Sequence, residues 1–147
     1  MRAARAVYGN TEKVARALAK GLEDGGVYVD CVRVEATKFN ELNRYDLLVV
    51  GGPVHAWSAS KPIKAFLERL KSVEDLSGKK AFALDTKMSS SRLAGSAAGK
   101  IEGKLKSLGL TIIKPHASAV VKGRKGPLEE GAEETFKQLG AELAKMI

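Results

Sequence analysis

The sequence predicts an α/β protein in which helices cover both faces of a doubly wound parallel sheet. Apolar, β-branched runs alternate along the chain with amphipathic helical segments, and the run "LLVV" is apolar at every position. Strands that alternate with helices imply parallel pairing through right-handed crossovers, and a fully apolar strand is typical of a sheet buried on both faces. The length suits one domain, so we expect residues 1–147 to form a single domain.

The first helix is expected over Glu12–Glu23. Its apolar positions lie four residues apart on one stripe, formed by Val14, Leu18 and Leu22. Asn10 or Thr11 can cap its start, and Gly25 follows its end.

Four later segments have strand composition. They are Val27–Val34, Tyr45–Gly52, Lys79–Thr86 and Leu110–Val121. Pro115 predicts an interruption or an edge position in the last of them. The polar connection "NELNRYD" between the first two has room for a short helix.

Three further helices are expected between and after these strands. The first starts at Ser60, a cap residue, with Pro62 in its first turn. The second carries Ile101, Leu105 and Leu108 on one face. The third follows Gly126-Pro127, with glutamates early and the stripe Ala132, Phe136, Leu139, Leu143 and Met146 facing the core.

The composition excludes several classes of protein. No apolar run approaches the roughly 20 residues of a membrane span, and the start of the chain lacks the apolar segment of a secretory signal. One cysteine, Cys31, fits a reducing cytoplasm and small core filling. The net charge of +8 comes from lysines and arginines spread along the chain, so a solvated basic surface is favoured over nucleic-acid binding.

Ligands of doubly wound sheets bind outside the carboxyl ends of the strands. That rule selects the strand-to-helix loops "YGNT", "GGPVHAWSASKP" and "DTKMSSSRLAGSAAG", which are rich in Gly, Ser and Thr. Helix N-terminal amides after "YGNT" favour an anion. Instead of binding an anion, "YGNT" could be an ordinary strand-to-helix turn. In "GGPVHAWSASKP", Trp57 could be a partly buried core residue instead of a ligand contact.

With these loops in place, the chain resembles the flavodoxin family along essentially its whole length. The resemblance rests on "GNTEKVARALAKGL", "YDLLVVGGPVHAWSASKPIKAFL", "KKAFALDTKMSSSRLAGSAAGKIEGKLKSLG" and "VVKGRKGPLEEG". It implies a three-layer, five-stranded sheet of order 2-1-3-4-5 and an FMN-binding electron carrier whose partners are redox proteins. Basic loops would suit an acidic redox partner.

The resemblance also implies the cofactor contacts. Gly9, Asn10 and Thr11 would hold the FMN phosphate through backbone N–H groups and the Thr11 hydroxyl. One ring loop would be Pro53, Val54, His55, Ala56 and Trp57, with Trp57 stacked on the isoalloxazine. The other would be Asp85, Thr86, Lys87, Met88, Ser89, Ser90, Ser91 and Arg92, with backbone groups bonded to the pyrimidine edge. This loop lacks the tyrosine that often stacks on the ring's outer face in the family, and Met88 could pack there instead.

The chain departs from the family at its start. The family's phosphate loop usually supplies several hydroxyl residues before Gly-Asn-Thr, whereas Arg5, Ala6, Val7 and Tyr8 stand there. Either "RAARAVY" is the first strand and the loop is shortened, or those residues are the loop and the strand is missing. Arg5 could replace part of the lost donors. Family carriers are also typically acidic, and this chain is basic.

Three functions are therefore weighed. An FMN-binding electron carrier leads, ahead of an FMN-dependent NAD(P)H:quinone or flavin-type reductase. The third is a flavodoxin-like domain with weakened or lost FMN binding that acts through protein contacts. His55 could tune a flavin or bond to backbone, and His116 is expected to be structural. Scattered histidines and one cysteine indicate no metal site, and no nucleophile stands beside a base and an orienting acid.

Overall fold

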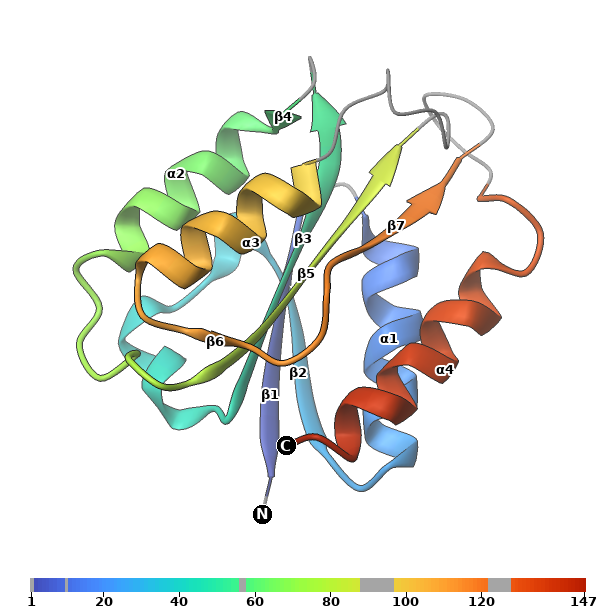
Figure 1. The fold of residues 1–147 in the computed structure, drawn as a ribbon, viewed down its shortest axis with the longest axis horizontal. Coiled ribbons are helices and arrows are strands. Elements are labelled where there is room, and N and C mark those ends of the chain that lie inside the picture. The colour runs from blue at the N-terminus through green and yellow to red at the C-terminus, as the bar shows by residue number, and fades with distance from the viewer. Residues whose placement is uncertain (1, 10, 56–57, 88–96, 122–127) are drawn as a thin grey trace.

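The structure is a computed structural model of the 147-residue chain. It describes residues 2–9, 11–55, 58–87, 97–121 and 128–147. Helices lie on both faces of one sheet, and the strands point towards one common edge (Figure 1). We call this edge the carboxyl edge.

The sheet has the order expected. Strands β2 (Tyr28–Arg33), β1 (Ala3–Tyr8), β3 (Leu47–His55), β5 (Lys80–Lys87) and β6 (Thr111–Ile112) are parallel neighbours. β7 (Ala117–Val120) pairs with β5 further along, so β6 and β7 together form the fifth strand. The break between them contains Pro115, as the sequence predicts. The order 2-1-3-4-5 is confirmed.

The first strand is present, which decides between the two alternatives for "RAARAVY". β1 pairs with β2 over six residues and with β3 over five, and Ala4–Tyr8 are buried. Only residues 9–11 separate it from α1 (Glu12–Asp24). The chain therefore keeps the first strand, inside the sheet between β2 and β3, and shortens the loop that follows it.

Two apolar layers flank the sheet. α2 (Lys61–Leu70) and α3 (Ala97–Ser107) pack against one face through residues that include Ile63, Phe66, Ile101 and Leu105. α1 and α4 (Ala132–Ala144) cover the other face around Leu18, Leu22, Phe82 and Leu143. Cys31 packs at the margin of this second layer, in agreement with its expected role.

Helices α1 and α4 approach each other at two glycines. A Cβ added to Gly140 would lie 2.1 Å from the Leu18 carbonyl oxygen, and one added to Gly21 would lie 1.9 Å from the Lys137 carbonyl oxygen. No larger residue fits at either position without moving a helix backbone.

Several boundaries differ from expectation. β3 continues to His55 because β4 (Ser58–Ala59) turns back and pairs with its end. Two 3₁₀ segments, η1 (Val34–Ala36) and η2 (Phe39–Arg44), connect β2 to β3, and η2 supplies the short helix expected there. α4 begins late because its N-cap Gly131 has a φ of 84°, a left-handed conformation that separates the preceding turn from the helix. Met146 lies beyond α4 and is 40% exposed, so its assignment to the core stripe is wrong.

Candidate functional site

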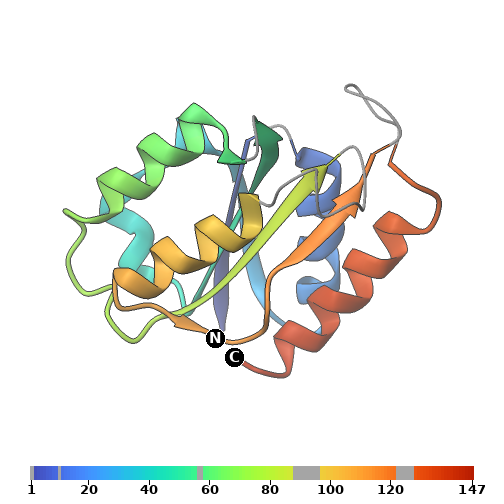
Figure 2. The same ribbon diagram turned by 45° about the horizontal axis from the view of Figure 1, so that its top comes forward.

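The carboxyl ends of β1, β3 and β5 lie side by side. Tyr8 is paired with Gly51, Gly52 with Asp85, and Pro53 with Thr86. The strands that precede the three loops selected from the sequence therefore end along the same stretch of the carboxyl edge (Figure 2). This stretch is the candidate ligand site.

Gly9 continues the strand pairing beyond β1. Its N–H donates to the Gly51 carbonyl oxygen at 3.0 Å. A Cβ at this position would lie 3.4 Å from Pro53 Cδ, so the turn is close to the end of β3. The Gly9 amide is thus engaged by the sheet, and an anion at this turn would depend on other donors.

Thr11 supplies such a donor. It is the N-cap residue of α1 and is only 3% exposed, yet its side chain makes no capping hydrogen bond. Within the described part of the chain, its Oγ1 is buried and has no hydrogen-bond partner. A buried hydroxyl without a partner is costly, and such groups mark sites where a ligand or water completes the bonding.

The donor set around Thr11 suits a phosphate. The first N–H groups of a helix have no partners within the helix, and the helix dipole makes that end positive. The Thr11 carbonyl accepts from Ala15 N–H at 3.0 Å, which fixes the start of α1. The hydroxyl and the first-turn amides together can bind an anion. The residues present therefore fit the phosphate of FMN, although with fewer hydroxyl donors than a longer loop would supply.

Two arginines add positive charge on the same side of the sheet. Arg16 Nη2 lies 3.5 Å from the Tyr8 hydroxyl, and the Arg33 guanidinium lies 5.8 Å from the centroid of the Tyr8 ring. Both arginines also pair with exposed glutamates, Glu12 and Glu35. Sequence reasoning missed these arginines because their approach to Tyr8 follows from strand pairing and helix packing.

The end of β3 brings backbone close to the site. A Cβ at Gly51 would lie 2.6 Å from Leu84 Cδ1, and one at Gly52 would lie 2.8 Å from Ile63 Cγ1. Pro53 is partly buried at the end of this stretch. Val54 and His55 belong to β3 and pair with β4. Asn10, Ala56 and Trp57, which the sequence assigns to the cofactor, lie outside the described residues.

Asp85 has a structural role that the sequence did not indicate. The side chain is fully buried, and Oδ2 accepts a hydrogen bond of 2.9 Å from the backbone N–H of Ala98. This carboxylate therefore holds the start of α3 against β5. No local sequence motif predicts this hydrogen bond, because Ala98 lies 13 residues after Asp85 in the sequence. Thr86 is buried and Lys87 half-buried, whereas the expected contacts Met88, Ser89, Ser90, Ser91 and Arg92 lie outside the described residues.

Arg5 does not serve the phosphate turn. Its Nη2 donates to the Tyr45 hydroxyl at 2.5 Å and lies 3.4 Å from Glu41 Oε2 and 3.7 Å from Asp30 Oδ2. Tyr45 and Glu41 precede β3, at the edge opposite the carboxyl edge. The expectation that Arg5 replaces lost phosphate donors is wrong, because strand alternation directs its side chain towards Glu41 of η2 and away from the phosphate turn.

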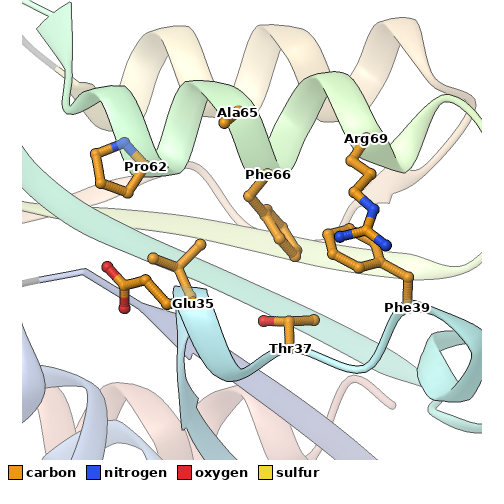
Figure 3. A pocket seen from close by; sticks show the side chains of 8 residues that line it. Glu35, Thr37, Phe39, Pro62, Ala65, Phe66 and Arg69 are labelled. Carbon is orange, nitrogen blue, oxygen red and sulfur yellow. The ribbon is translucent and has the colours of Figure 1, made fainter.

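A separate groove of about 220 Å³ lies between α2 and the η1–η2 segment (Figure 3). Phe39 and Phe66 form part of its wall, and the Arg69 guanidinium lies 4.4 Å from the centroid of the Phe39 ring. None of the residues that the sequence assigns to the cofactor lines it.

Within the described ranges, no group of three or more potential ligand side chains could hold a metal ion. His116 receives a structural contact, since Glu102 Oε2 accepts a hydrogen bond of 2.8 Å from its backbone N–H and lies 3.2 Å from its Nδ1. None of the described helices has the length and apolar character needed to cross a bilayer.

The fold and the edge define a doubly wound α/β protein with a ligand site where its parallel strands end. Residues 7–139 match the model of the flavodoxin family, and the chain belongs to this family. Family members bind flavin, usually FMN.

Solved structures with this fold cover nearly the whole chain. A flavodoxin from the domain Archaea is 23% identical with a TM-score of 0.80, over 98% of this chain and 97% of its own. The flavodoxin of Streptococcus pneumoniae TIGR4 is 21% identical with a TM-score of 0.82, over 99% of each chain. Oxidised flavodoxin 1 from Bacillus cereus is 20% identical with a TM-score of 0.81, over 100% of this chain and 99% of its own. No curated protein matches the chain.

Proposed function

We propose that this protein is an FMN-binding electron carrier of the flavodoxin family. The observation that carries the proposal is the buried, unpartnered hydroxyl of Thr11 at the N-terminus of α1. Family membership and the alignment of three loops on one edge support it. Thr11 and the first-turn amides of α1 would hold the phosphate. Pro53–Trp57 and Asp85–Arg92 would lie on the two sides of the ring.

A bound flavin supplies the redox chemistry by accepting and releasing electrons one or two at a time. This chain would orient the ring, limit water around it and set the local electric field. The net charge of +8 makes the field positive, which favours the reduced, anionic cofactor. We therefore infer a less negative reduction potential than in an acidic relative, and redox partner proteins that carry acidic surfaces. We further propose a single domain over residues 1–147 and a cytoplasmic location.

Cofactor uptake is the direct test. Purified protein is stripped of flavin, and FMN and riboflavin are titrated separately while flavin fluorescence is followed. We expect both to bind, with FMN bound more tightly because only FMN reaches Thr11 and the helix N-terminus. A colourless protein that takes up neither flavin would refute the proposal.

A second candidate rests on the short turn between β1 and α1. Three residues connect them, and the Gly9 amide is already bonded to Gly51. A flavodoxin-like domain that acts through protein contacts would also have this turn. Failure of FMN uptake, combined with retained cooperative unfolding, would favour this candidate.

A further inference from the structure

Helices α2 and α3 run side by side with the same polarity on one face of the sheet (Figure 1). Lys104 Nζ on α3 pairs with Glu68 Oε1 on α2 at 3.1 Å. Residues four apart lie on the same side of a helix. One turn nearer the carboxyl edge, the corresponding positions are Lys64 on α2 and Lys100 on α3. Lys64 and Lys100, which carry like charges, therefore lie one helical turn from this ion pair, on the side of the carboxyl edge.

Two more lysines extend this positive surface. Lys61 is exposed and begins α2. Lys87 ends β5, and strand alternation places its side chain on the same face as Asp85, which caps α3. We call Lys61, Lys64, Lys87 and Lys100 the lysine face. Within the described ranges, none of the four forms an ion pair.

The acids of α2 and α3 are already neutralised. Glu68 is paired with Lys71 at 2.8 Å as well as with Lys104, and these lysines hold the pKa of its carboxyl below the usual value. Glu102 contacts Lys106 at 3.8 Å and His116 at 3.2 Å. Both acids lie further from the carboxyl edge than the lysine face, so they leave its charge uncompensated.

The lysine face also opposes the helix dipoles. The N-terminal end of a helix is positive and favours acidic side chains. α1 and α4 follow this rule with Glu12, Glu133 and Glu134, but the first turns of α2 and α3 contain no acid. Lysines at these ends are unfavourable to the fold, which is expected of a surface used for binding.

We propose that the lysine face docks an acidic protein, with partner carboxylates bridging Lys64 and Lys100. This inference rests on the proposed function, because the face borders the carboxyl ends of β3 and β5, where a carrier would exchange electrons. Carboxylates would neutralise both lysines and the two helix dipoles together. Nucleic acid fits less well, since the large exposed apolar side chains of the described residues are Tyr28 and Met146, both at the opposite edge. Among the described residues, the lysine face has no aromatic platform on which bases stack.

Two variants of equal charge test the proposal. One carries Lys61→Glu and Lys64→Glu, and the control carries Arg44→Glu and Lys145→Glu, two exposed cations at the opposite edge. The probe is fluorescently labelled polyglutamate, followed by anisotropy at low salt. We expect the first variant to bind about tenfold more weakly and the control to change less than about twofold. Equal losses would show that only net charge matters and would overturn the proposal.

Two further readouts complete the test. Lys100→Glu alone should raise Tm, because the new carboxylate would face Lys64, precede Lys104 by one helical turn and suit the N-terminus of α3, while polyglutamate binding falls. A fall in Tm would show that the two lysines do not face each other. Duplex DNA that binds more tightly than polyglutamate, and loses binding in the first variant, would reassign the face to nucleic acid. All titrations are run on flavin-free and FMN-saturated protein, so failure of FMN uptake remains separate from failure of docking.

Discussion

The guanidinium carbon of Arg5 lies 4.6 Å from the centroid of the Tyr45 ring, inside the protein. Arg5 stands in β1, between β2 and β3, and is only 4% exposed. Its charge is compensated by Asp30 and Glu41, and the Tyr45 hydroxyl also donates to Asp30 Oδ2. The cluster ties η2 and the edge strand β2 to the centre of the sheet. A buried arginine is tolerated here because carboxylates and a π face surround it.

Replacing Arg5 by methionine should lower the free energy of unfolding by about 2 kcal/mol. Methionine keeps much of the stem's packing but leaves Asp30 and Glu41 without their cation. Partial exposure of these carboxylates, 35% and 28%, keeps the cost moderate. Urea unfolding measures the loss. In the double variant with Asp30→Asn, part of this lost stability should be recovered. If the stability loss of the double variant equals the sum of the two single losses, Arg5 and Asp30 are not coupled.

Gly140→Ala should destabilise the protein by about 3 kcal/mol, because the new methyl group would press on the Leu18 carbonyl and separate α1 from α4. Gly103→Ala on α3 is the matched control. A Cβ at Gly103 meets no atom within 4 Å, so this substitution should raise the free energy of unfolding by about 0.5–1 kcal/mol through helix propensity. Chemical denaturation of both variants measures the difference. Stabilisation of both variants would contradict the close contact between the two helices.

Thr11→Val should act in opposite directions on stability and on binding. In flavin-free protein it removes a buried hydroxyl without a partner, so we expect a gain of about 1 kcal/mol in unfolding free energy. In the FMN titration, the same change should weaken affinity about tenfold while leaving riboflavin affinity unchanged. Thr11→Ser, which keeps the hydroxyl, should retain most of the FMN affinity. Parallel losses for FMN and riboflavin would remove Thr11 from the phosphate site.

Alkaline pH should destabilise the fold through Tyr45. Burial, together with the hydrogen bond to Asp30, raises the pKa of the Tyr45 phenol above its ordinary value of 10.0. The unfolded chain then ionises first, so the stabilisation is complete below pH 10.0 and is lost as pH rises towards the folded pKa.

Tyr45→Phe should reduce this alkaline loss, measured as the change in unfolding free energy between about pH 9 and about pH 11. Both proteins carry Cys31→Ala, because burial also raises the pKa of the Cys31 thiol from 9.0 and its titration would overlap. The lysines titrate equally in both proteins and cancel from the comparison. An unchanged alkaline loss in Tyr45→Phe would place the titrating group elsewhere.

Much of the fold followed from local patterns. The fully apolar run Leu47–Val50 indicated a strand covered on both faces, and Pro115 indicated an interruption or an edge position, which the structure shows as the break between β6 and β7. The end of β3 and the start of α4 were misjudged. Pairing with β4 extends β3, and the left-handed backbone of Gly131 delays α4. Both depend on contacts or conformations that composition does not specify.

The class of fold and the three loops at the carboxyl edge could be predicted from the sequence, because hydrophobic periodicity and glycine-rich loops are local properties. The roles of individual polar side chains depend instead on tertiary contacts. Strand pairing directs the Arg5 side chain towards Glu41 of η2. Close packing buries the Thr11 hydroxyl, which has no hydrogen-bond partner in the described part of the chain. The tertiary structure also brings Glu68 of α2 to Lys104 of α3, one helical turn after Lys64 and Lys100 respectively. Such roles depend on neighbours distant in sequence, which only the folded chain brings within reach of hydrogen bonds and charge.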